Sequence, residues 1–113
     1  DILVRLIIKK TPGKMVYQAM RNQRTDFPVL TCAVACMDGE YRAAIGARPG
    51  RALLIPDAEG ILADGITGER AEAFGAYVAA QVPTESNLRG SARYRSRLAR
   101  VLTTRAVKTL GGI

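Results

Sequence analysis

The two-residue turn Asp38-Gly39 constrains the fold of this 113-residue chain more than any other feature of the sequence. Asp followed by Gly tolerates the positive φ angles that join two antiparallel strands in the tightest hairpins. Before the turn, Val29–Met37 is apolar on both faces, which is typical of a central strand that is covered on both sides. After the turn, apolar and polar residues alternate in Glu40–Ala47. The sequence therefore predicts an antiparallel hairpin at the centre of a sheet.

Further strands are predicted on either side of this hairpin. Ile2–Lys9 is rich in β-branched residues, and Thr11-Pro12-Gly13 then interrupts it. The composition of Met15–Met20 leans towards a helix, but the segment is short and lies between two strands, so we expect a strand. After a turn at Arg48-Pro49-Gly50, Ala52–Ile55 can resume the pairing.

The second half of the chain carries helix signals. A short helix is expected over Pro56–Gly65, a second over Thr67–Gln81 with Thr67 as its cap, and a third from a Ser91 cap to Gly111-Gly112. The buried stripe expected for the second helix is Ala71, Phe74, Tyr77 and Val78, with Val82 after its end. The stripe expected for the third is Tyr94, Leu98, Val101, Leu102, Ala106 and Leu110. Strands followed by helices predict an α+β fold, an antiparallel sheet of three to four strands with three helices packed on one face.

Composition bounds the class of protein. Hydrophobic residues make up 48% of the chain and charged residues 24%, as in one globular domain with its own core. No apolar run approaches the roughly 20 residues of a membrane-spanning helix, so no membrane partner is expected. Cys32 and Cys36 would lie about 13 Å apart on one side of a strand, too far for a disulfide. We interpret them as buried reduced thiols, which fits a cytoplasmic protein.

The chain is strongly basic, which is compatible with several kinds of partner. The chain has 17 basic and 10 acidic residues and a formal net charge of +7, and no acidic residue occurs from Arg89 to Ile113. Such a surface suits nucleic acid, an anionic cofactor or an acidic partner subunit. However, few aromatic residues could stack on bases, no nucleic-acid-binding motif is present, and the basic residues spread over several helix faces. A solvated helix face or a partner-facing surface is therefore favoured over nucleic acid, which is the alternative.

No arrangement of residues in the sequence supports catalysis. The chain has no His, and its acidic residues fall in turns and helix starts, where capping explains them. The glycines of Gly46–Arg51 and Gly65–Gly68 match neither the dinucleotide nor the phosphate-loop pattern. Two arginines make Arg48–Arg51 the one loop to consider for anion contact. We expect no catalytic, cofactor-binding or metal-binding residue here, and no enzyme activity from the chain alone.

Three segments carry distinctive motifs. Residues 17–35 contain Tyr17 and Asp26-Phe27-Pro28 ahead of an Ala/Val-rich strand, and residues 42–49 read RAAIGARP. Residues 88–106 read LRGSARYRSRLARVLTTRA, the most specific of the three. From about residue 17 to residue 110, the chain resembles the C-terminal domain of the FAD-binding subunit of molybdenum hydroxylases, the family of carbon monoxide dehydrogenase and xanthine dehydrogenase. It departs from that family at Arg93, where Glu is usual, and in the turn after Gly46.

The resemblance implies a role in a larger oxidoreductase. The parent subunit would carry FAD and pass electrons from the iron–sulfur clusters of a partner subunit to an acceptor, while substrate is oxidised at a molybdopterin centre in another subunit. The family's Gly-rich FAD segments lie upstream of this domain, and no part of the chain matches them. The domain itself would pack on the FAD-binding portion and help to dock the iron–sulfur and molybdopterin subunits.

The expected organisation and contacts follow from the same resemblance. The chain does not begin with Met, so we expect a piece of a longer protein, with residues 1–10 as the closing strand of a preceding FAD-binding domain and residues 11–113 as the flavoprotein C-terminal domain. A free-standing assembly domain that starts near Asp1 is the remaining alternative. The residues expected to contact the flavin domain or the partner subunits are Asp26, Phe27, Pro28, Arg89, Gly90, Tyr94 and Arg95. Each also has a local explanation, such as turn capping or core packing.

Overall fold

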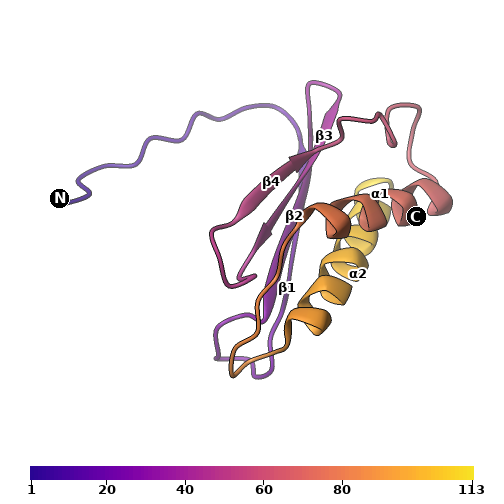
Figure 1. Cartoon of the computed structure of the whole chain (residues 1–113). Helices are drawn as coiled ribbons and strands as arrows, with labels where there is room; N and C mark the ends of the chain where they lie inside the picture. The colour runs from indigo at the N-terminus through magenta and orange to yellow at the C-terminus, as the bar shows by residue number, and fades with distance from the viewer.

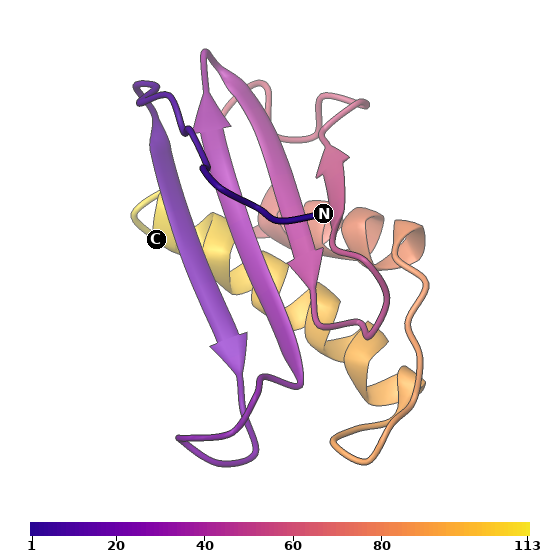
Figure 2. The same cartoon turned by 90° about the vertical axis from the view of Figure 1, so that its left-hand side faces the viewer.

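The chain folds into a four-stranded antiparallel sheet with two helices packed on one face, as a computed structural model of residues 1–113 shows (Figures 1 and 2). The strands are β1 (Lys14–Met20), β2 (Leu30–Met37), β3 (Glu40–Gly46) and β4 (Leu53–Pro56), and they follow one another across the sheet in this order. The helices are α1 (Gly68–Gln81) and α2 (Ala92–Leu110). The predicted α+β class and the antiparallel sheet are confirmed, with two helices instead of three.

The central hairpin forms at the predicted turn. Asp38 has a φ of 52° and Gly39 a φ of 77°, the left-handed conformations that a two-residue hairpin requires. Met37 pairs with Glu40 across the turn, and the pairing continues as far as Thr31 and Gly46. The strand predicted over Met15–Met20 is also present, as β1, and it pairs with β2 along its whole length.

The core lies between the sheet and the helices. Leu30, Cys32 and Val34 of β2 are fully buried on the helix-facing side, within a cluster of 17 buried residues that includes Phe74 of α1 and Leu102 of α2. Sγ of Cys32 lies 3.5 Å from Oγ1 of Thr103, which ties β2 to α2. Burial raises the pKa of the Cys32 thiol. Both cysteines are free, and Cys36 is only half-buried.

Both helices begin at the predicted caps. Oγ1 of Thr67 accepts a hydrogen bond from the backbone N–H of Arg70 at 3.2 Å, and Oγ of Ser91 accepts one from that of Tyr94 at 3.1 Å. These side chains satisfy donors that have no partner within the first helical turn.

The short helix expected over Pro56–Gly65 does not form. The two carboxylate oxygens of Asp57 accept hydrogen bonds from the backbone N–H groups of Ile61 and Leu62 at 2.9 and 2.8 Å, and these hold the segment as a series of turns. Gly60 has a φ of 68°, which is incompatible with a continuing right-handed helix. The prediction was therefore wrong because it did not allow for the left-handed glycine.

The buried stripe of α2 is rotated relative to the prediction. Leu98, Leu102 and Ala106 are buried as expected, but Tyr94 is 41% exposed, and Val101 and Leu110 are half-buried. The buried side of α2 instead includes Ala99, Val107 and two polar residues, Arg95 and Thr103. The prediction counted apolar residues alone. It therefore left out Arg95, which is buried because each of its three side-chain nitrogens donates a hydrogen bond.

The first residues form no strand in this structure. Residues 1–10 are exposed throughout, and Figures 1 and 2 show them leaving the sheet on the side opposite the helices. A strand requires a neighbour for its backbone hydrogen bonds, and this segment has none here. That residues 1–10 close a preceding domain stays a prediction. Neither helix is long and apolar enough to cross a membrane.

We predict that Gly75→Ala lowers the free energy of unfolding by about 1–3 kcal/mol, because Gly75 lies where α1 crosses α2. A Cβ at this position would clash with Oγ1 of Thr104 and lie 2.8 Å from the backbone oxygen of Arg100. Gly68→Ala is the matched control, since no atom lies within 4 Å of its added Cβ. Urea denaturation should show the control unchanged or stabilised by about 0.5–1 kcal/mol. Equal stability of the two variants would contradict the close crossing.

Candidate functional site

The seven predicted contact residues gather at one end of the domain. Asp26, Phe27 and Pro28 belong to the loop between β1 and β2, while Arg89 and Gly90 lie in the connection between α1 and α2. The remaining two residues, Tyr94 and Arg95, are in the first turn of α2. These segments are more than 60 positions apart in the sequence and yet hydrogen-bond directly.

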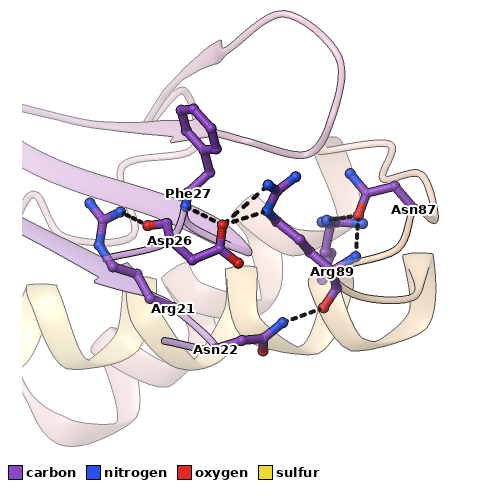
Figure 3. Close-up of polar contacts among 7 residues, drawn as sticks. Arg21, Asn22, Asp26, Phe27, Asn87 and Arg89 are labelled. Carbon is purple, nitrogen blue, oxygen red and sulfur yellow. Dashed lines mark hydrogen bonds and ion pairs between the residues drawn. The ribbon is translucent and has the colours of Figure 1, made fainter. Parts of the chain in front are cut away.

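Arg89 joins the two loops through its guanidinium group. Its Nε and Nη2 donate to one carboxylate oxygen of Asp26 at 3.2 and 3.1 Å, as Figure 3 shows. The same oxygen accepts from the backbone N–H of Phe27 at 2.7 Å, and the guanidinium lies 5.1 Å from the centre of the Phe27 ring. The hydrogen bonds from Arg89, and then that from Phe27, lower the pKa of Asp26 below its usual value of 3.8.

Two asparagines extend this contact between the loops (Figure 3). Nδ2 of Asn22 donates to the backbone oxygen of Arg89 at 2.9 Å. Oδ1 of Asn87 accepts from the backbone N–H of Arg89 at 2.9 Å, and Nη1 of Arg21 donates to the backbone oxygen of Asp26 at 2.6 Å. Residues of both loops therefore add hydrogen bonds around the Asp26–Arg89 ion pair.

Arg95 is the buried member of the group, with only 1% of its surface exposed. Its Nε donates to the backbone oxygen of Val29 at 2.8 Å, and Nη1 donates to the backbone oxygens of Glu85 and Gly90, both at 2.7 Å. Its Nη2 donates to Oδ1 of Asn87 at 2.7 Å. No carboxylate accepts from it, so neutral oxygens hold the buried charge. Arg95 therefore acts within this domain.

The other candidate contact residues differ in how far their side chains are exposed. Phe27 is 72% exposed and Tyr94 is 41% exposed, so both aromatic rings are available to another surface. A Cβ at Gly90 would lie only 3.0 Å from Cγ1 of Val29, which gives this glycine a packing role. That the seven residues also contact another domain or subunit stays a prediction: Asp26, Phe27, Pro28, Arg89, Gly90, Tyr94 and Arg95.

Sequence reasoning missed the open face of the sheet as a surface. Tyr17, Ala33, Ala44 and Leu54 pair in register across all four strands and so share one face. The alternation of the strands places this row opposite the helix-facing residues. Tyr17 and Leu54 are each 59% exposed, and the neighbouring Met15 is 64% exposed. The signal was present, since β2 is apolar on both faces and the helices cover only one.

Two further expectations concern metal ligands and the loop Arg48–Arg51. No three His, Cys, Asp or Glu side chains lie close enough to hold a metal ion. Arg48, considered for anion contact, donates to the backbone oxygens of Arg51 and Pro83 at 2.6 and 2.8 Å. Two of its three side-chain nitrogens thus hydrogen-bond within the chain. A shallow depression of about 500 Å³ beside β3 and β4 is lined by residues such as Tyr41 and Leu54.

The chain is an α+β domain in which a four-stranded antiparallel meander carries two helices on one face, and the last helix is basic. The sequence profile of the CO dehydrogenase flavoprotein C-terminal domain matches residues 15–110. The chain therefore belongs to this family, which confirms the resemblance to the FAD-binding subunit of molybdenum hydroxylases. No curated protein sequence matches it significantly.

Solved structures share the fold. Carbon monoxide dehydrogenase from Hydrogenophaga pseudoflava, in a form that lacks the Mo-pyranopterin moiety of its molybdenum cofactor, is similar with a TM-score of 0.75 and 24% identity over 87% of this chain. Quinoline 2-oxidoreductase from Pseudomonas putida 86 gives 0.71 and 18% over 88%. A Cu,Mo-CO dehydrogenase in its cyanide-inactivated form gives 0.70 and 20% over 93%. The match spans 36%, 37% and 39% of those chains, respectively.

We predict that Arg95→Ala lowers the free energy of unfolding by about 3 kcal/mol, because it leaves buried oxygens without a donor. Arg95→Lys should also destabilise, since an ammonium cannot reproduce the planar fork of donors. Arg93→Ala, two positions away and exposed, is the control and should change stability by less than about 0.5 kcal/mol. Chemical denaturation measures all three. An Arg95→Ala variant as stable as the control would show that its hydrogen bonds do not hold the loops.

The Asp26–Arg89 pair predicts an acid-sensitive contribution to stability. Because the folded-state pKa of Asp26 lies below its unfolded value, the contribution is present above the unfolded pKa and is lost as pH falls through the folded one. The stability difference between the wild type and Asp26→Asn should therefore be constant from neutral pH to about pH 5 and shrink below about pH 4. Urea denaturation across this range measures it. A difference that does not change with pH would contradict the ion pair.

Proposed function

We propose that this chain is the accessory C-terminal domain of the FAD-binding subunit of a molybdopterin-dependent dehydrogenase. In this role it supports electron transfer from iron–sulfur clusters through FAD to an acceptor. It does so by packing on the flavin-binding part of the subunit and by docking partner subunits, without catalytic residues of its own. Family membership supports the assignment, and the observation that carries the packing role is the exposed apolar row on the open face of the sheet.

An exposed sheet face of this composition is unusual for an isolated domain. Antiparallel sheets with one solvated face normally place polar side chains there. Here the transverse row consists of Tyr17 and Leu54 near the edges with Ala33 and Ala44 between them. This row is apolar across all four strands, so the apolar surface of another domain could pack against it. Exposed apolar patches of this kind mark interaction surfaces.

The N-terminal segment supports packing on the same side. Six large apolar residues within it are 72–89% exposed, namely Ile2, Leu3, Val4, Leu6, Ile7 and Ile8. In Figures 1 and 2 this segment lies on the side of the open face, away from the helices. A preceding flavin-binding domain that pairs with residues 1–10 would then lie next to the row formed by Tyr17, Ala33, Ala44 and Leu54. One domain contact would bury both apolar surfaces.

We predict that Tyr17→Glu/Leu54→Glu, introduced into the whole flavin subunit, loosens the packing of this domain. Carboxylates buried in an apolar contact cost several kcal/mol, so FAD should dissociate roughly tenfold faster or more. The subunit should also unfold in two thermal transitions instead of one. FAD retention during gel filtration and scanning calorimetry measure these effects.

The matched control is Ala73→Glu/Thr109→Glu, which places the same two charges on exposed positions of α1 and α2. It should retain FAD as the wild type does. Circular dichroism of the 113-residue chain verifies that both double variants fold, since all four positions are solvent-exposed there. Unchanged FAD release and a single transition in the open-face variant would contradict the packing role.

A further inference from the structure

The helical side of the domain carries a second surface with a different chemistry. A groove of about 410 Å³ runs between α1 and α2. We define the arginine groove by its residues Ala76, Ala79 and Ala80 from α1 and Arg93, Arg97 and Arg100 from α2. The alanines form its short-chain wall and the arginines its charged wall. No aromatic residue lines it.

The three arginines are free of internal partners. The ion pairs of the chain are Arg42–Glu40, Arg89–Asp26 and Lys108–Glu72, so none involves Arg93, Arg97 or Arg100. Their side chains make no hydrogen bond within the chain either, and all three residues are exposed. They differ in this from Arg48, Arg89 and Arg95, whose side chains hydrogen-bond within the chain.

Their placement opposes the stability of the helix that carries them. Positions 93, 97 and 100 are separated by four and three residues, so the charges stack on one face and repel one another. Arg93 also lies in the first turn of α2, where the helix dipole favours acidic residues. This turn contains no acidic residue. Residues that destabilise the helix that carries them are expected at functional sites, here a binding surface.

We infer that the arginine groove binds a helix of a partner protein subunit that carries carboxylates about one turn apart. This inference rests on the proposed function for its assumption of a partner subunit. Guanidinium groups bind carboxylates through two parallel hydrogen bonds. The span from Arg93 to Arg100 is about 10.5 Å along the axis, and a docked helix repeats its own side chains at the same rise. The alanine wall lets the backbone of that helix approach closely.

Nucleic acid is the less suitable occupant. Single strands bind through bases stacked on aromatic side chains as well as through phosphate contacts, and the groove has no aromatic residue. The nearest exposed aromatic residue in the sequence, Tyr94, lines an adjacent depression that shares Arg93 and Arg97 with the groove, and one ring offers a stacking platform for a single base. The competing ligand class therefore becomes one outcome of the test.

The test uses the 113-residue chain and a labelled helical peptide of about 20 residues, with Glu at turn spacing on one face and Ala on the other. Fluorescence anisotropy at physiological ionic strength should show that Arg93→Glu/Arg97→Glu/Arg100→Glu weakens binding roughly tenfold or more. The control Arg5→Glu/Lys10→Glu/Arg51→Glu changes the net charge equally at exposed positions and should retain most of the affinity. Amide shifts on peptide addition should centre on Ala76, Ala79 and Ser96.

Three results would overturn the inference. Equal weakening by both triple variants would mean that net charge alone attracts the peptide. Absence of peptide binding to the wild type would remove the site, and tighter binding of single-stranded DNA of equal charge through the same arginines would assign the groove to nucleic acid. Tyr17→Glu/Leu54→Glu should leave peptide binding intact, so failure of the flavin-domain packing and failure of this docking site are separate outcomes.

Discussion

The buried guanidinium of Arg95 is the interaction on which the rest of this domain depends. It hydrogen-bonds the start of β2 through Val29 and the α1–α2 connection through Glu85, Asn87 and Gly90. A single side chain of α2 thereby joins the helix to the segment that leads into β2 and to the connection that precedes α2. The Asp26–Arg89 pair forms outside this buried centre, and the exposed Phe27 ring is positioned by it. The candidate contact loops are therefore held by the same residue that fixes the core.

The fold gives the domain two surfaces of unlike chemistry. The side of the sheet away from the helices carries an apolar row with Tyr17 and Leu54 exposed, whereas the groove between α1 and α2 carries three unpaired arginines. An apolar surface suits permanent packing within one polypeptide, and a charged one suits a subunit that must be recognised among others. Such a division fits a domain that links a flavin-binding region to a partner without taking part in chemistry.

Much of the architecture could be predicted from the sequence because local signals and the fold agree. The Asp38-Gly39 hairpin and the Thr67 and Ser91 caps are decided within a few residues. The predictions that failed have two causes. The left-handed Gly60 and the Asp57 hydrogen bonds prevent a helix that composition favours, and Arg95 is buried because oxygens of loops elsewhere in the chain accept from it. The candidate site was identified by resemblance, but its division into buried and exposed members required the structure. The open sheet face was visible only as the two-sided apolar character of β2.

Hydroxyl-radical footprinting of the whole flavin subunit, compared with the 113-residue chain, tests the central claim most directly. Met15 and Tyr17 are reactive side chains on the open face and are 64% and 59% exposed in this chain. If the domain packs on the flavin-binding region through this face, both should be strongly protected in the subunit, while Tyr77 on α1 should react equally in the two samples. Undiminished oxidation of Met15 and Tyr17 in the flavin-loaded subunit would contradict the account.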